Sequence, residues 1–297
     1  MRFFRNYNTI FTHRSDSDRI FVGIGYECRY CGQRRPEGKR WNKAHSVPAF
    51  LGNKTIFSID ECSRCNKLFG DKYENDFSKF TNFYRTILEV KGRKKIPKTK
   101  SEKIIIENIN GVTNINSLDW EAVERKGNKI ILNHTSEFYV PLMVWKCLAK
   151  IIYGLIPPNS LEKYTWIRES ILNPDLQPRV IPCLALLASA PWIKLKCDVF
   201  VVLFEHKKAE PEGAPKLIGV LYFKGIFYHI PLLSIDQVLT IEANAKPLTF
   251  NFPPITENAK WGKSKPAKLS QLDLTSSDPI RTNQKIELDA IGEIKIK

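Results

Sequence analysis

Paired cysteines are the first residues in this sequence that can do chemistry. Cys28 and Cys31 form one Cys-x-x-Cys pair, and Cys62 and Cys65 form a second. Two thiolates from each pair can complete the tetrahedral ligand shell of one Zn²⁺ ion. Buried cysteines with unrelated roles have no reason to repeat the same gap. The sequence therefore predicts a structural zinc site held by these cysteines.

A single histidine lies between the two cysteine pairs. The 30 residues from 32 to 61 exceed the roughly 15–20 residues that separate the pairs of a simple zinc ribbon, so a segment is inserted there. The insertion contains "WNKAHSVPAFLGN", in which His45 precedes the turn residues Pro48, Gly52 and Asn53. Because a neutral imidazole titrates in the range that a general base needs, His45 is a candidate base. The alternative is a histidine that merely packs in the core.

The order of these motifs resembles that of the HNH (ββα-metal) endonucleases. Residues 26–78 contain Cys-x-x-Cys, then "AHSVPAFLGN", then "DECSRCNKLFGDKYENDF". The corresponding family patterns are Ala-His-x-x-Pro-x-x-Leu-Gly-Asn and Glu-Cys-x-x-Cys-Asn-x-x-Phe. The resemblance implies a structural zinc that pins a β-hairpin to a helix, with the base on the hairpin and a metal ligand on the helix. It also implies hydrolysis of phosphodiester bonds in nucleic acid.

The same resemblance implies roles for particular residues. His45 would be the general base that deprotonates the attacking water. Asn66, directly after Cys65, would hold a catalytic divalent cation such as Mg²⁺, Mn²⁺ or Ni²⁺. That cation would stabilise the leaving oxygen and the negative charge of the transition state. Asn53 corresponds to the middle Asn that braces the loop holding the histidine.

The chain departs from the family at the residue before the base. Many HNH sites have Asp or another ligand there, whereas this chain has Ala44. A lone Asn is a poor anchor for a hard cation, which prefers carboxylate oxygen. We predict that Glu74, about 80° around an ideal helix from Asn66, supports the cation. Asp60 and Glu61, before the second pair, are alternatives.

The overall charge points to a polyanionic partner. The chain has 46 Lys+Arg against 31 Asp+Glu, a net charge of +15 at pH 7. Such a surplus favours nucleic acid, with DNA as the first expectation. A basic protein with a solvated charged linker is the alternative.

Compartment and assembly follow from the apolar segments and the cysteines. The N-terminus has no signal segment, and the apolar stretch "FYVPLMVWKCLAKIIYGLIPP" is interrupted by Lys146 and Lys150 and falls short of a membrane span. We expect a cytoplasmic protein without membrane contact, and a homo-oligomer stays open. In a reducing compartment the remaining cysteines are expected neither to form a disulfide framework nor to bind the zinc; they are Cys147, Cys183 and Cys197.

Composition along the chain predicts an α+β fold in separate parts. Residues 1–83 are expected to form a zinc-braced ββα-metal (treble-clef-like) HNH domain with a helix starting near Cys65. Residues 84–103 are basic and contain "KGRKK", which is typical of a linker or a DNA-backbone contact. Residues 104–253 are expected to form a separate α+β domain that recognises something or assembles the protein. Residues 254–297, where aromatic residues nearly vanish, are expected to be a flexible polar tail.

Local periodicity predicts the elements of the second domain. "CDVFVVLF", "KLIGVLYF" and "IFYHIPL" are β-branched and aromatic runs, which favour an antiparallel sheet. Before them, apolar residues recur at helical spacing from Leu142 to Tyr153. We expect this helix to pack one side on a core, with Lys146, Lys150 and Gly154 on another face.

Two alternatives to the HNH interpretation stay open. Pro-Asp at Asp175, followed by Glu205 and Lys207, resembles the Pro-Asp…Glu-x-Lys signature of another nuclease class, although such short patterns also arise by chance at the end of a strand. The second alternative is a non-catalytic, zinc-dependent nucleic-acid-binding protein, which would not need His45. Our interpretation is a metal-dependent endonuclease with a conditional role, such as defence against foreign DNA.

Overall fold

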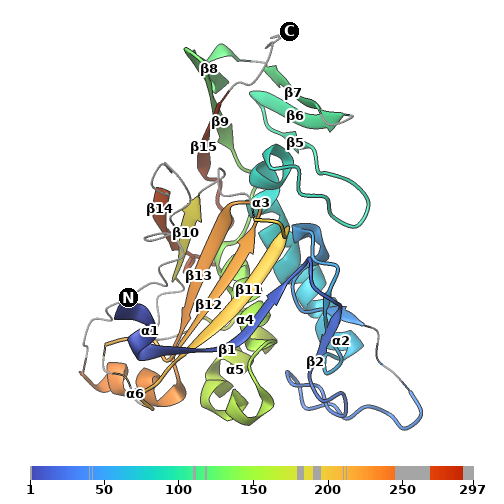
Figure 1. The fold of residues 1–297 in the computed structure, drawn as a ribbon, viewed down its shortest axis with the longest axis vertical. Helices are drawn as coiled ribbons and strands as arrows, with labels where there is room; N and C mark the ends of the chain where they lie inside the picture. The colour runs from blue at the N-terminus through green and yellow to red at the C-terminus, as the bar shows by residue number, and fades with distance from the viewer. Residues whose placement is uncertain are drawn as a thin grey trace.

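The computed structural model describes residues 2–39, 41, 43–109, 112–117, 119–178, 184–189, 195–209, 211, 213–244 and 268–289. Over these residues the chain has an α+β fold built around one large antiparallel sheet (Figure 1). Across this sheet the strands follow the order β1 (Tyr7–Arg14), β11 (Val199–His206), β12 (Leu217–Phe223), β13 (Ile226–Leu232), β10 (Leu184–Ser189) and β14 (Lys268–Asp273).

The large sheet confirms the antiparallel strands predicted for the second domain. Strands β11, β12 and β13 are neighbours in the sheet, in register from Val199↔Phe223 to Leu217↔Leu232, and a short turn at residues 224–225 joins β12 to β13. The edge strand β1, however, comes from the N-terminal segment and pairs with β11 from Tyr7↔His206 to Arg14↔Phe200. The sequence placed residues 7–14 with the HNH domain because a pairing partner almost 200 residues away leaves no local signal.

The helix α4 (Pro141–Tyr153) packs on this sheet. Gly219 of β12 makes the approach close, since a Cβ there would lie 2.2 Å from the Cδ1 atom of Ile152. Lys146 and Lys150 are as buried as the apolar residues of the helix. The expectation that they occupy a separate face, away from the core, is therefore wrong, and both ammonium groups are held by polar partners inside the protein.

A small sheet and one long helix form the ββα unit. The sheet consists of β2 (Ile20–Val22), parallel to β4 (Ile56–Ser58), and β3 (Ala44–His45), antiparallel to β4. A 3₁₀ turn, η1 (Ala49–Leu51), lies between β3 and β4. The helix begins directly after Cys62 and runs through α2 (Ser63–Leu68), the π-helical segment η2 (Phe69–Glu74) and α3 (Asn75–Ile87).

The ββα unit and the large sheet share one hydrophobic core. Leu51, Phe69 and Phe77 of the ββα unit belong to the same buried cluster as Trp145 of α4 and Val201 of β11. The helix α3 continues to Ile87, so the expected boundary at residue 84 falls inside a helix. The two parts are therefore in direct contact instead of being joined only by a solvated linker.

The remaining elements complete both ends of the molecule. At the top of Figure 1, β6 pairs with β5 and β7, and β9 pairs with β8 and β15. Their bounds are β5 (Thr99–Lys100), β6 (Ile104–Ile109), β7 (Val112–Ser117), η3 (Trp120–Ala122), β8 (Val123–Lys126), β9 (Lys129–Thr135) and β15 (Asn283–Asp289). The other helices are α1 (Arg2–Asn6), η4 (Pro158–Tyr164), α5 (Thr165–Leu172) and α6 (Ile235–Asn244).

Strands β14 and β15 lie in the segment expected to be a flexible tail. Residues 268–273 pair with β10 and residues 283–289 pair with β9, so this part of the segment is ordered by backbone pairing. A strand pairs through main-chain N–H and C=O groups and therefore needs few aromatic residues of its own. Residues 254–267 and 290–297 lie outside the described residues, as does Cys183. Within the described part of the chain, no helix has the length and apolar character needed to cross a bilayer.

Candidate nuclease site and its zinc-binding cysteines

The four cysteines predicted as zinc ligands converge. The Sγ atoms of Cys28, Cys31, Cys62 and Cys65 all lie within 4.8 Å of one another, and those of Cys31 and Cys62 are 3.6 Å apart. All four are free thiols instead of disulfides. Sulfur atoms from two separate Cys-x-x-Cys pairs at these distances fit the tetrahedral shell of one Zn²⁺ ion.

The backbone prepares both cysteine pairs for thiolate chemistry. The first pair sits on a turn in which the Gly32 N–H donates to the Cys28 carbonyl at 2.8 Å, with Gly32 in the left-handed region at φ +72°. The Cys62 N–H donates to the Cys28 sulfur, and the Cys65 N–H donates to the Cys62 sulfur, both at 3.5 Å. Amide donors stabilise negative charge on sulfur, so the surroundings also fit a thiolate–zinc site.

The hydrogen bond between Cys28 and Cys65 shifts their pKa values in opposite directions. A hydrogen bond from Cys65 lowers the pKa of Cys28 to about 4, and the same bond raises the pKa of Cys65. Protein groups alone thus ionise one thiol at the expense of its neighbour. A bound Zn²⁺ would supply the positive charge that lets all of them ionise together.

His45 lies at the surface end of the hairpin. Ala44 pairs with Ser58 and His45 with Phe57, so the side chain of Ala44 is buried and that of His45 points to the outer side of the small sheet. The imidazole packs on the Phe57 ring with centroids 4.8 Å apart. Among the described residues neither ring nitrogen makes a hydrogen bond. Partial burial, with the charges of Arg93 and Lys150, lowers the pKa of His45.

Asn53 braces the loop that follows His45. Its side-chain amide donates to the carbonyl oxygens of Val47, at 2.6 Å, and Ile56, at 3.0 Å. Its Oδ1 atom accepts from the N–H groups of Thr55 and Ile56, both at 3.0 Å. Each hydrogen-bonding group of this buried side chain is therefore used within the loop. This bonding is what a loop brace requires, and it leaves Asn53 without a free group for substrate.

Asn66 and Glu74 lie on the long helix but have different surroundings. Asn66 is in the first turn of α2, and within the described residues its half-buried side chain makes no hydrogen bond. Glu74 ends the π-helical segment, and its Oε1 atom lies 4.0 Å from the Nζ atom of Lys150. The angle expected between Asn66 and Glu74 assumed α-helical winding throughout, so the intervening π-helix invalidates it.

A lysine from α4 reaches the centre of the ββα unit. The buried Nζ atom of Lys150 lies 3.2 Å from Glu61 Oε2 and donates to the carbonyl oxygen of His45 at 3.2 Å. It also lies 5.5 Å from the centroid of the Phe69 ring. Burial opposes the charge, but Glu61 and Glu74 leave the pKa of Lys150 raised, whereas burial raises the pKa of Glu61 to about 7. We take the ammonium to be charged, because three oxygen partners surround it.

Sequence reasoning missed this role of Lys150, since it treated the lysine as a break in an apolar segment and as part of a helix face outside the core. A lysine within a helix that is otherwise buried was nevertheless a usable signal. Buried lysines are rare unless they are paired, so Lys150 called for a carboxylate partner.

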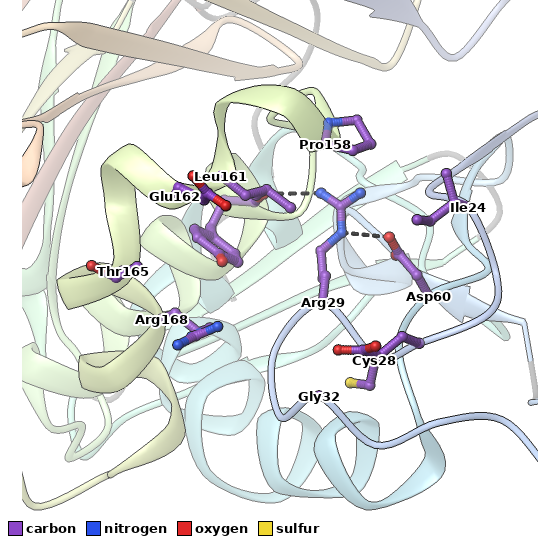
Figure 2. A pocket seen from close by; sticks show the side chains of 12 residues that line it. Ile24, Cys28, Arg29, Gly32, Asp60, Pro158, Leu161, Glu162, Thr165 and Arg168 are labelled. Carbon is purple, nitrogen blue, oxygen red and sulfur yellow. Dashed lines mark hydrogen bonds and ion pairs between the residues drawn. The ribbon is translucent and has the colours of Figure 1, made fainter.

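A second buried ion pair lies at the junction between the first cysteine pair and α4. The Arg29 Nε atom donates to Asp60 Oδ2 at 2.8 Å, and both side chains are only 3% exposed. The same guanidinium donates to the carbonyl oxygens of Tyr153, Gly154 and Ile156 at the C-terminal end of α4. Arg29 and Asp60 line a cavity of about 300 Å³ together with Leu161 and Arg168. Figure 2 shows the Arg29–Asp60 ion pair as a dashed line.

The competing Pro-Asp…Glu-x-Lys residues have other partners. Glu205 lies 3.6 Å from the ammonium of Lys163 and 3.9 Å from that of Lys216. Lys207 is exposed and donates to the carbonyl oxygen of Phe4. Asp175 is exposed in the loop after α5. Within the described residues no contact joins Asp175, Glu205 and Lys207 into one site.

Comparison with known proteins agrees with this geometry. Residues 28–82 match the family model described as HNH endonuclease. The match covers both cysteine pairs, the β3–β4 hairpin and the helix as far as Asn82 of α3. This segment is therefore an HNH endonuclease domain, which supports a nuclease-type function on a nucleic-acid substrate. Neither the curated proteins nor the solved structures contained a match to the chain.

The cysteine cluster predicts a specific loss of zinc. Cys62→Ser removes one thiolate and should abolish stoichiometric zinc binding, because three sulfur ligands hold Zn²⁺ more weakly than four. Elemental analysis of the purified chain measures this, with thermal unfolding as a second readout. Cys197→Ala is the matched control, since Cys197 is buried elsewhere, in a cluster with Phe204. Zinc retained at wild-type content in Cys62→Ser would contradict the site.

The Lys150–Glu61 pair predicts a large change in stability. Lys150→Met leaves Glu61 buried without its cation and should lower the free energy of unfolding by about 3–5 kcal/mol. Urea denaturation measures the loss. The double variant Lys150→Met with Glu61→Gln removes both charges and should recover much of it. A single variant as stable as the wild type would show that the pair contributes little.

Proposed function

We propose that the chain is a metal-dependent HNH endonuclease that hydrolyses phosphodiester bonds in nucleic acid, with DNA as the proposed substrate. The observation that carries the proposal is the match of residues 28–82 to the HNH family, together with His45 on the hairpin of a ββα unit. The ring nitrogens of His45, which have no hydrogen-bond partner among the described residues, and its lowered pKa support its role as the base. Cys28, Cys31, Cys62 and Cys65 would hold the structural zinc.

His45 would act by removing a proton from the attacking water. Its pKa lies below the ordinary value, so the imidazole is neutral at pH 7 and able to accept a proton. The hydrogen bond from Lys150 to the His45 carbonyl and the bracing of the loop by Asn53 fix the backbone on both sides of the ring. A base whose backbone is already fixed loses little conformational entropy when it takes its catalytic position.

Asn66 is the residue that best fits a catalytic cation. Its amide oxygen has no partner among the described residues, whereas the carboxylate of Glu74 already faces the ammonium of Lys150. A bound divalent cation would stabilise negative charge on the phosphate. Because Mg²⁺ commonly keeps several waters and uses substrate oxygens as ligands, one protein amide can contribute without a complete protein shell. Glu74 stays a weaker proposal for the same role.

A basic loop beside the hairpin supports DNA as the partner. Lys91, Arg93, Lys94 and Lys95 are exposed, and Gly92 between them lies against the backbone of Phe50 in the turn after His45. Lysine and arginine contacts to phosphates give affinity without sequence preference. A nuclease of low specificity endangers its own cell, so we propose that its activity is under conditional control, as in defence against foreign DNA. The cytoplasmic location stays the expectation drawn from the sequence.

A non-catalytic zinc-dependent nucleic-acid-binding protein is the second candidate. The specific observations in its favour are Ala44, which offers no ligand beside the base, and the engagement of Glu74 with Lys150. This candidate requires the cysteines and the basic loop but gives no task to the unpartnered groups of His45 and Asn66.

The first functional prediction separates these candidates. His45→Ala should retain zinc, fold and DNA binding but lower plasmid cleavage by roughly 10²–10⁴-fold, because positioned acid–base help is lost. Cleavage is measured with added Mg²⁺, Mn²⁺ or Ni²⁺. Asn66→Ala should keep some turnover but need more divalent cation. Wild-type protein that binds DNA and cleaves it with none of these cations would favour the binding protein, and cleavage by His45→Ala at the wild-type rate would exclude our site.

The pH dependence of cleavage has a predicted sign. Because the pKa of His45 is lowered, the rate should be constant near neutral pH and fall only when acid protonates the ring, below the ordinary histidine range. Arg93→Gln removes one of the charges that lower this pKa, so the fall should move to higher pH. The pH profile of kcat/KM for both proteins tests this. An unchanged profile in Arg93→Gln would contradict the influence of Arg93.

A further inference from the structure

Three rings form a row across the outer face of the small sheet. The strand register places Phe21 of β2 opposite Phe57 of β4, and Phe57 opposite His45 of β3. Their neighbours Ala44 and Ile56 point inward and are buried. The Phe21 side chain at the far end of the row is 43% exposed. The ring row therefore runs from solvent to the candidate base.

The rings are in contact with one another, and two cations lie close to them. The Phe21 and Phe57 centroids are 5.8 Å apart with the rings nearly parallel, at 28°, and His45 lies 4.8 Å from Phe57. Lys43 Nζ lies 5.0 Å from the Phe21 centroid, and Arg19 lies 5.5 Å from that of Phe57. Among the described residues no carboxylate pairs with Lys43 or Arg19.

The chemistry of the ring row fits one kind of occupant. A nucleobase offers a flat π-face that stacks on an aromatic ring, and its phosphate needs a nearby cation. Bases inside a duplex are already stacked on one another and cannot reach such a ring. We infer that the ring row binds an unpaired base of a nucleic-acid strand, delivering the adjacent phosphodiester to His45. The ligand class is single-stranded nucleic acid, or a duplex with an unpaired or splayed nucleotide.

This inference rests on the proposed function only for the cleavage step, because binding to the ring row needs no turnover. An isolated exposed phenylalanine would need no explanation. Here an exposed ring, two cations that pair with no carboxylate in the described part of the chain, and the candidate base share one face in register. Stacking is tolerant of base identity, so the ring row would select for unpaired structure instead of sequence.

Binding of short labelled DNA to the chain of residues 1–297 tests the inference. Anisotropy is measured without added divalent cation, for a single strand and for the duplex of the same sequence and length. Wild-type protein should favour the single strand. Phe21→Ala should weaken single-strand binding by about tenfold and change duplex binding little. Phe21→Trp should keep the preference, because indole also stacks.

Phe138→Ala is the matched control. Phe138 is also exposed and has the guanidinium of Arg281 4.3 Å from its centroid, but it lies outside the HNH domain. Its removal should leave both affinities unchanged. Phe21→Ala with wild-type single-strand affinity, or with equal losses for single strand and duplex, would overturn the inference, as would loss of the preference in Phe21→Trp.

Cleavage assays separate this inference from the proposed function. If the chain is not a nuclease, wild-type protein will cleave nothing while the Phe21-dependent preference persists. If only the inference is wrong, wild-type protein and Phe21→Ala will cleave single strands at the same rate.

Discussion

Two buried ion pairs, formed by consecutive residues, hold the cysteine pairs and α4 together. Asp60 pairs with Arg29, and Glu61 pairs with Lys150, immediately before the second cysteine pair. Removing ions from water costs several kcal/mol each, and the cost is offset only when partners and hydrogen bonds are in place. Arg29 meets this condition with three carbonyl oxygens at the end of α4, and Lys150 meets it with the His45 carbonyl. The cysteine pairs and α4 therefore fix one another.

Because of these ion pairs, the part of the chain beyond the HNH domain helps to hold that domain in its folded arrangement. A small zinc unit commonly depends on its metal to fold, but here the ββα unit also shares a hydrophobic core with α4 and the large sheet. The close contact of Gly219 with Ile152 sets how near α4 lies to the sheet, and hence where Lys150 ends. A displacement of α4 would be transmitted to the strand that carries His45 through the side chain of Lys150.

The backbone of His45 is held by the protein interior, whereas its ring lies on the outer face. Its backbone carbonyl faces inward to Lys150, while its ring lies outward beside Phe57. Contacts in the protein interior thus fix the backbone position of His45, and the side chains on the outer face offer contacts that a polyanion can use. Ala44 fits this division because its small side chain is buried where many HNH sites place a ligand. The ammonium of Lys150 is held at the carbonyl of the next residue, His45.

Local sequence determined the features that depend on spacing and turn chemistry. Two Cys-x-x-Cys pairs indicated the metal cluster, Asn53 and Gly52 indicated the turn after His45, and β-branched runs indicated the strands of the large sheet, because each depends on residues a few positions apart. Tertiary structure alone decided that β1 pairs with β11, that residues 268–289 form strands and that Lys150 meets Glu61. Those contacts join residues far apart in the chain, and their energy comes from burial and charge pairing that exist only once the core has formed.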